Sequence, residues 1–122
     1  MASTHAQRKA LGDYGERLAA RHLQARGFTV LDRNWRCGDG EIDIVAADGG
    51  TLVVCEVKTR SSDRYGTPFE AITPEKAARL RRLGWLWSNE HQIRFGRLRL
   101  DVVAIVRHRR GSAEVEHIVG VV

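Results

Sequence analysis

Residues 40–45, GEIDIV, and residues 52–60, LVVCEVKTR, are two apolar and largely β-branched runs that decide the fold. A short segment containing Asp48-Gly49-Gly50 separates them. Two such runs joined by a glycine-rich turn predict a β-hairpin. We therefore expect the rest of the chain to be arranged around a sheet with this hairpin at its centre.

The hairpin carries four charged side chains that an apolar sheet does not need. Glu41 and Asp43 lie two residues apart, as do Glu56 and Lys58. Because side chains alternate between the faces of a strand, each pair occupies one face. The charged groups of each strand are therefore predicted to stand side by side.

The register of the hairpin decides which charged groups meet. A Gly49-Gly50 loop places Asp43 opposite Glu56, whereas an Asp48-Gly49 loop places Glu41 opposite Glu56. Both registers gather the four groups on one face, and a three-residue loop with flush pairing would separate them. We expect the shared face.

Facing carboxylates repel each other, so a half-buried pair must take up a proton or bind a cation. An all-oxygen donor set favours a hard cation such as Mg²⁺ or Mn²⁺. Lys58, two residues beyond Glu56, could then orient a hydrolytic water or neutralise charge on a phosphate. The alternative, which spacing alone leaves open, is an exposed hairpin with charged residues on its solvent face.

Asp43 followed by Glu56-Val57-Lys58 resembles the D…(D/E)-x-K signature of the restriction-endonuclease-like nucleases. More narrowly, the chain is similar over about residues 8–106 to the YraN family of small bacterial proteins, which is similar in fold to Holliday junction resolvases. One departure is Ile42, which stands where many superfamily members have a proline. Six segments in order carry the family resemblance: Gly15-Glu16, Arg33-Asn34-Trp35-Arg36, Gly40-Glu41-Ile42-Asp43, Glu56-Val57-Lys58-Thr59-Arg60, Thr73-Pro74-Glu75-Lys76 and Leu100-Asp101-Val102-Val103.

The resemblance implies a metal-dependent endonuclease acting on DNA phosphodiesters, at branched or single-stranded DNA. It implies Mg²⁺ or Mn²⁺ held by Asp43, Glu56 and the Val57 carbonyl, with Lys58 positioning the attacking water. Glu16 of the first helix would complete the acidic cluster. Likeness to enzymes of a two-fold junction also implies a homodimer. The competing reading is a nucleic-acid-binding module of the same fold without catalysis.

Composition agrees with a nucleic-acid partner. The 122 residues suit one domain, 1–122, with a core over about 8–106 and a C-terminal hairpin strand in 107–122. A net charge of +5 with a pI near 9.9 suits a polyanion, although it would also serve solubility. We find no membrane-spanning run and no secretory signal, and Cys37 and Cys55 fit no metal spacing, so we expect a cytoplasmic protein with reduced thiols.

Periodicity and turn residues predict a single-domain α/β fold, and the resemblance implies a mixed sheet flanked by helices in three layers. The exact topology, restriction-endonuclease-like, rests on the resemblance. Asp101 is expected to bind backbone or an arginine and is left out of the metal site. The expected order is α-β-β-β-α-β-β: a helix over 4–26, a strand over 28–35, the hairpin, a loop over 60–72, a helix from 73 to about 89, and strands over 97–107 and 114–119.

Basic residues around these elements are candidates for phosphate contacts. A charge run on a helix is usually only a solvated face. Trp35, flanked by arginines, would either pack in the core, which we favour, or stack on a base. The nucleic-acid-binding candidates are Arg33, Arg36, Arg60, Ser61, Lys76, Arg79 and Arg82.

Overall fold

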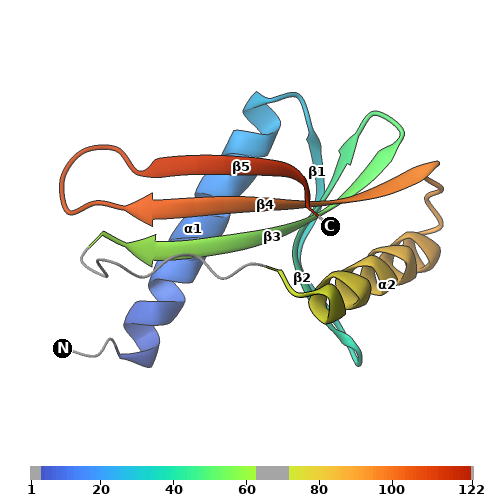
Figure 1. The fold of residues 1–122 in the computed structure, drawn as a ribbon, viewed down its shortest axis with the longest axis horizontal. Helices are drawn as coiled ribbons and strands as arrows, with labels where there is room; N and C mark the ends of the chain where they lie inside the picture. Colours follow the sequence, from blue (N-terminus) through green and yellow to red (C-terminus); the bar gives the residue numbers. More distant parts are fainter. Residues whose placement is uncertain (1–3, 63–71, 122) are drawn as a thin grey trace.

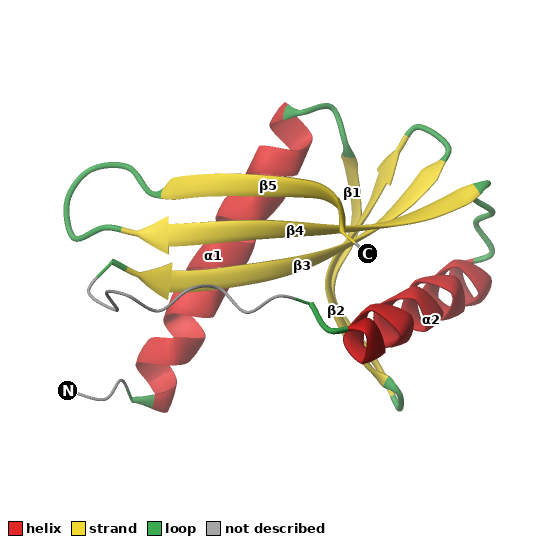
Figure 2. Cartoon of the chain, in the orientation of Figure 1, coloured by secondary structure: helices red, strands yellow, loops and turns green. Residues whose placement is uncertain are grey.

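The chain forms one five-stranded mixed sheet with a helix on each face (Figures 1 and 2). The computed structural model describes residues 4–62 and 72–121. The strand order is β1-β2-β3-β4-β5, with β3 and β4 parallel and the other neighbours antiparallel. The predicted α/β class, three layers and element order are confirmed. The elements are α1 (His5–Ala25), β1 (Thr29–Cys37), β2 (Gly40–Asp48), β3 (Thr51–Ser61), α2 (Pro74–His91), β4 (Arg97–Arg107) and β5 (Glu114–Val121).

Both helices begin where their capping residues predict. Thr4 caps α1 in a capping box with Gln7, in which each side chain bonds the other residue's backbone N–H. Thr73 caps α2 by accepting a hydrogen bond from the Lys76 backbone N–H at 3.1 Å. Pro74 takes the first helical position, where no N–H is needed.

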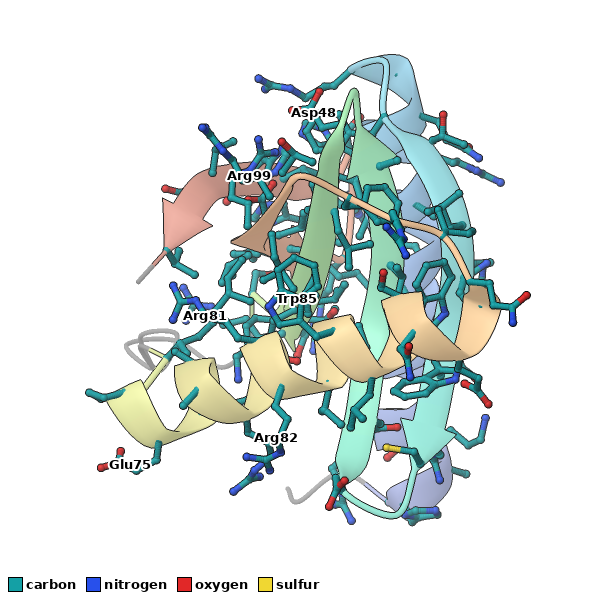
Figure 3. The ribbon with its side chains drawn as sticks, turned by 90° about the vertical axis from the view of Figure 1, so that its right-hand side faces the viewer. Asp48, Glu75, Arg81, Arg82, Trp85 and Arg99 are labelled. Atoms are coloured by element: carbon teal, nitrogen blue, oxygen red, sulfur yellow. The ribbon has the colours of Figure 1, made fainter. Side chains whose placement is uncertain are left out.

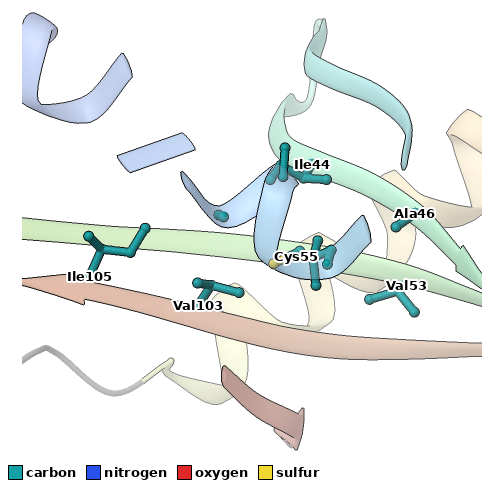
Figure 4. Packing of buried hydrophobic residues seen from close by; sticks show 9 residues of the cluster. Ile44, Ala46, Val53, Cys55, Val103 and Ile105 are labelled. Atoms are coloured by element: carbon teal, nitrogen blue, oxygen red, sulfur yellow. The ribbon is translucent and has the colours of Figure 1, made fainter. Parts of the chain in front are cut away.

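The two faces of the sheet bury separate apolar clusters. Against α1, the cluster is built on alternating residues of β2, β3 and β4 (Figure 4). Against α2, it is built on the alternate residues of the same strands together with one face of the helix, which includes Leu80, Leu83 and Trp87. Burial of the central strands on both sides explains their nearly unbroken apolar sequence. The α1-face cluster contains Ala19, Ala20, Leu23, Ile44, Ala46, Val53, Cys55, Val103 and Ile105.

The element boundaries differ from the predicted ones in a few places. β1 starts one residue later than predicted and extends two residues further, to Cys37. Arg60 and Ser61, expected in a loop, instead continue β3 and pair with Val106 and Arg107 of β4. The rest of the predicted loop lies largely outside the described residues. In the described parts of the chain, neither helix is long and apolar enough to cross a membrane.

A buried ionic network ties the C-terminal hairpin to the central one. Asp101 on β4 is fully buried and accepts hydrogen bonds from Arg99 Nε and from the Gly120 backbone N–H, at 2.8 and 3.0 Å. His117 Nε2 on β5 lies 2.9 Å from the same carboxylate. Arg99 also reaches Asp48 at the end of the central hairpin, as Figure 3 shows. The expectation that Asp101 binds backbone and an arginine is confirmed.

α2 packs closely on the sheet because Gly84 has no side chain. A Cβ at Gly84 would lie 2.6 Å from both Leu98 Cδ1 and Val54 Cγ2. Nonbonded carbon atoms do not approach so closely, so any larger residue would push the helix off the sheet.

Gly84→Ala is expected to lower the free energy of unfolding by about 1–3 kcal/mol, the usual cost of overpacking a core. Chemical denaturation measures this change. Gly12→Ala on α1 is the matched control, because a Cβ there meets nothing within 4 Å. It should stabilise the chain by about 0.5–1 kcal/mol through helix propensity. Equal effects of the two substitutions would contradict the close packing of α2.

Candidate active site

The central hairpin places Asp43 opposite Glu56. The pairs Asp48–Thr51 and Ile44–Cys55 fix the register, with Gly49-Gly50 as the loop. One step further along the strands, the Asp43 carboxylate accepts a hydrogen bond from the Val57 backbone N–H at 2.8 Å. It also shares a hydrogen bond with the Glu56 carboxyl group. Of the two registers that the sequence allows, the structure thus has the one that pairs these two acids.

Glu41 does not join this pair. Its carboxylate is exposed and binds Arg36 Nε at 2.9 Å. The regular alternation of β2 is broken beside it, since Ile42 and Val45 lie in the same apolar cluster although they are three residues apart. The shared face predicted for all four charged groups therefore holds for Asp43, Glu56 and Lys58, while Glu41 turns towards β1.

Two lysines meet the buried end of Glu56. Its side chain is only 11% exposed, and its Oε2 contacts the ammonium group of Lys76. Lys58 Nζ lies 3.9 Å from the same oxygen. Lys76, predicted from its place in a basic helix as a phosphate contact, thus lies against a carboxylate. Lys76 lies one helical turn before the buried Leu80 and next to the buried Ala77. This position in the sequence indicates a side chain directed towards the sheet.

The two acids have opposite pKa shifts. Burial raises the pKa of Asp43 to about 8, helped by the adjoining Glu56 and by the charge of Glu16. Burial also acts to raise the pKa of Glu56, but the hydrogen bonds from Asp43 and Lys76 outweigh it and lower that pKa. The pair therefore holds one proton between its two carboxyl groups at neutral pH, and the remaining negative charge is compensated by lysine.

Asp43→Asn is expected to flatten the pH dependence of stability measured in EDTA. Between the unfolded pKa of 3.8 and the folded value of about 8, the folded chain holds a proton that the unfolded chain has released. Stability should therefore fall as the pH rises through 6 to 8, by up to about 1.4 kcal/mol per pH unit for one proton. Urea unfolding at each pH measures the slope. Asp39→Asn, in the exposed β1–β2 turn, should keep the wild-type slope, and a slope that survives in Asp43→Asn would contradict the shared proton.

α1 brings Glu16 to the edge of this pair. A Cβ on Gly15 would lie 1.9 Å from Thr59 Oγ1, so the helix crosses β3 in direct contact just after Lys58. Burial raises the pKa of Glu16, while a hydrogen bond from the Asn34 side chain and the charge of Arg33 oppose the rise. The predicted place of Glu16 beside the acidic pair agrees with its effect on the pKa of Asp43.

Asn34 is a site residue for which the sequence suggested no role. It lies between Arg33 and Trp35, which pair with Ile44 and Ile42, so it lies across from Asp43. Its φ of 52° is a left-handed conformation that asparagine tolerates better than most residues. Asn34 combines this left-handed conformation in the middle of β1 with a contact between its amide and Glu16. A single asparagine between arginine residues did not indicate either feature in the sequence.

The donor set suits a divalent cation that keeps some of its water. Among residues 4–62 and 72–121, no three His, Cys, Asp or Glu side chains come together as a metal cluster. The carboxyl groups of Asp43 and Glu56 are nevertheless adjacent, and the backbone of Val57 lies between Glu56 and Lys58 along β3. Mg²⁺ is commonly bound by one or two carboxylates plus water and substrate phosphate, so this set fits the cation predicted from the sequence.

The predicted phosphate contacts occupy three regions. Arg33 acts on Glu16, and Arg36 binds Glu41, so both flank the acidic pair on the β1 side. Arg79 and Arg82 are exposed on α2, and the Arg79 stem passes within 4 Å of the position a Cβ would take at Gly40. Arg60 and Ser61 lie at the end of β3, half-buried and directly beyond the motif lysine.

Trp35 has the packing role favoured from the sequence. It is half-buried against the cluster beneath α2, and its indole N–H donates to Glu90 Oε2 at 3.0 Å. Trp87, in the same apolar cluster, is fully buried and donates to Asp32 Oδ2 at 2.8 Å. These two bonds join α2 to β1.

The chain is similar to proteins of several bacteria and to a protein of known structure. Relatives named UPF0102 protein are 58% identical in Nocardioides sp., over 93% of this chain and 92% of the relative, and 49% identical in Acidothermus cellulolyticus, over 98% of each. The structure of Hjc, a Holliday junction resolvase from the archaeal hyperthermophile Archaeoglobus fulgidus, matches with a TM-score of 0.44 and 19% identity, over 85% of this chain and 74% of that one. Residues 15–105 match the family described as "Uncharacterised protein family UPF0102". The chain therefore belongs to the UPF0102, or YraN, family.

Proposed function

We propose that this protein is a metal-dependent endonuclease that hydrolyses DNA phosphodiesters. The observation that carries the proposal is the half-buried pair of Asp43 and Glu56. Lys58 Nζ lies 3.9 Å from Glu56 Oε2, the oxygen that Lys76 also contacts. The environment that raises the pKa of Asp43 to about 8 lowers the folding stability of the chain. A hairpin with a purely structural role would gain nothing from such a pair of acids.

The acidic pair and its neighbours Lys58 and Glu16 each have a role in this reaction. Asp43 and Glu56 would hold Mg²⁺ or Mn²⁺ together with the Val57 carbonyl, after Asp43 releases its proton. When bound, the cation would polarise a phosphoryl oxygen and stabilise the charge of the departing oxyanion. Lys58 would hold and orient the attacking water, and Glu16 would bond to water at the edge of the cluster.

Phosphate contacts would supply most of the binding energy. Arg33 acts on Glu16 beside the acidic pair, and Arg36 and Arg79 lie nearer the β1–β2 turn, against Glu41 and Gly40. Arg60 and Ser61 follow the motif lysine on β3. Arg82 extends the basic surface along α2. Affinity should therefore fall steeply with salt. A branched or single-stranded substrate and a homodimer belong to the same proposal, since a two-fold symmetric junction is cut symmetrically by two copies of one site.

Cleavage of labelled DNA tests the proposal. Single-stranded, duplex, flapped and four-way-junction substrates are incubated with Mg²⁺, Mn²⁺ or EDTA. Strand cutting that requires the cation supports the nuclease function, and the preferred substrate identifies the DNA structure. If all four substrates remain intact with either cation, the proposal fails, and sedimentation of the protein with the junction separately tests the dimer.

A catalytically silent DNA-binding module is the second candidate, and one contact favours it. Lys76 already supplies a positive charge to Glu56, which removes part of the need for a cation. Titration of Mg²⁺ at pH 8 distinguishes the two functions, because a cation site should raise the melting temperature of wild type and leave that of Glu56→Gln unchanged. A melting temperature that ignores Mg²⁺ in wild type would favour the silent module.

A further inference from the structure

α2 presents one indole ring to solvent. Trp85 is 45% exposed, whereas Trp87, two residues later, is 1% exposed. In Figure 3 Trp85 and Arg81, which is one helical turn before it, project from the same edge of α2. An indole ring exposed to water lacks the large hydrophobic stabilisation that burial gives. A partner that stacks on Trp85 would therefore obtain most of its binding free energy from this ring.

An open hollow of about 570 Å³ lies beside this ring. Its lining combines aromatic rings, side-chain amides and a guanidinium group, and includes Trp85, Asn89, Gln92, Ile93, Arg94 and Phe95. The aromatic rings offer faces for a planar base, and the amides offer both donors and acceptors to its edge. Arg94 offers a partner for a phosphate.

The surrounding charge selects an anionic partner. Residues 79–97 carry five arginines, Arg79, Arg81, Arg82, Arg94 and Arg97, and Glu90 as the one acid. Glu90 is bonded to Trp35, and it lines the separate hollow next to Leu86 rather than the one beside Trp85. An aromatic surface among cations fits stretches of nucleic acid whose bases are unstacked, since duplex DNA offers no base face to an indole ring.

We propose that Trp85 and the hollow beside it bind the unpaired nucleotides of a single-stranded segment of nucleic acid, with a base stacked on the indole and phosphates on Arg81 and Arg94. The site is separate from the Asp43–Glu56 pair: Lys76 and Trp85 are nine positions apart on α2, which is about half a turn in angle and about 14 Å along the axis. It depends on the proposed function only for the class of substrate. The surface would hold the unpaired arm of a branched substrate while the acidic pair meets the backbone.

Binding measured without metal tests this site by itself. A fluorescein-labelled oligothymidylate and a duplex of equal length are titrated in EDTA with wild type, Trp85→Ala, Trp85→Phe and Leu86→Ala. We expect Trp85→Ala to weaken binding of the single strand about tenfold, within the range measured for loss of one stacked base. Trp85→Phe should keep most of the affinity, because phenylalanine still offers a ring. Leu86→Ala, which removes an apolar side chain of the same helix that is 38% exposed, should leave the affinity for the single strand unchanged.

Three results would overturn the proposal. The first is that Trp85→Ala binds the single strand as tightly as wild type does. The second is that Trp85→Ala weakens binding of the single strand and of the duplex equally. The third is that Leu86→Ala weakens single-strand binding as much as Trp85→Ala does. The first would leave a protein partner as the occupant of the exposed tryptophan. Melting temperatures confirm that each variant is folded. Because the titration uses no metal and no cleavage, a nuclease that cuts DNA but ignores Trp85 would refute this site alone.

Discussion

Glu56→Gln is expected to lower the rate of metal-dependent DNA cleavage by at least about 100-fold, because the loss of one anionic ligand removes much of the electrostatic stabilisation of the leaving group. The substitution keeps the size of the side chain and removes only its charge. The surroundings favour the charged form of Glu56, since its pKa is lowered by the bonds from Asp43 and Lys76 while burial raises the pKa of Asp43. Single-turnover cleavage with saturating enzyme measures the chemical step directly.

Binding and cleavage should respond in opposite directions to this change. Removing a negative charge near the phosphate leaves DNA binding equal or tighter, so a loss of cleavage cannot come from lost affinity. Glu41→Gln is the matched control, because Glu41 lies on the same hairpin but binds Arg36 outside the pair. Its cleavage rate should stay within about twofold of wild type, as surface ion pairs contribute little.

Lys58→Ala separates the roles of the two lysines. If Lys58 orients the attacking water, its removal should reduce cleavage about 100-fold or more while Mg²⁺ still raises the melting temperature. Wild-type cleavage in either Glu56→Gln or Lys58→Ala would show that the acidic pair is not the catalytic centre. Equal losses in the control Glu41→Gln would point to a general effect of charge on the hairpin.

The hairpin could be predicted from the sequence because local rules determine it. Gly49-Gly50 sets the loop, the apolar alternation sets the faces, and the pairing of Asp43 with Glu56 follows from one of two registers. The helix starts at Thr4 and Thr73 likewise depend on capping chemistry within a few residues. These features need no knowledge of distant contacts.

The surroundings of the pair depend on contacts across the fold and were not predictable in the same way. Lys76 is twenty residues from Glu56 in sequence, and only the docking angle of α2 brings its ammonium group to the carboxylate. The contact of Gly15 with Thr59 and the left-handed Asn34 likewise arise from packing between layers. Burial of Trp87 rather than Leu86 depends on the rotation of α2 about its axis, since the apolar periodicity of the helix allows either residue to face the sheet.

Asp101→Ala is expected to lower the free energy of unfolding by about 3–5 kcal/mol, the range for breaking a buried ion pair by removing one partner. Asp101 is 0% exposed, and Arg99 donates to both of its oxygens at 2.8 and 3.0 Å. Burial acts to raise its pKa, but the bonds from Arg99, Gly120 and His117 outweigh burial and lower it. Without the carboxylate, these three groups lose the acceptor that satisfies them.

Asp48→Ala is the matched control for this network. Asp48 binds the same guanidinium group at 3.0 Å, but its side chain is 44% exposed, so water can replace it. Its loss should cost no more than about 1 kcal/mol. Urea unfolding at pH 7 measures both variants, and similar costs for the two would contradict the role of burial.

The pH dependence supplies an independent check on Asp101. Because its folded pKa lies below the unfolded value of 3.8, its contribution is complete above that value and is lost as the pH falls through the folded pKa. The difference between wild type and Asp101→Ala should therefore be constant near neutral pH and shrink in strong acid. The slope between pH 6 and 8, which depends on the shared proton of Asp43, should persist in Asp101→Ala. Two carboxylates of one sheet, on β2 and β4, would thus act on stability in separate ranges of pH. Asp101 is fully compensated by fixed donors, whereas Asp43 shares a proton with Glu56 until a cation replaces it.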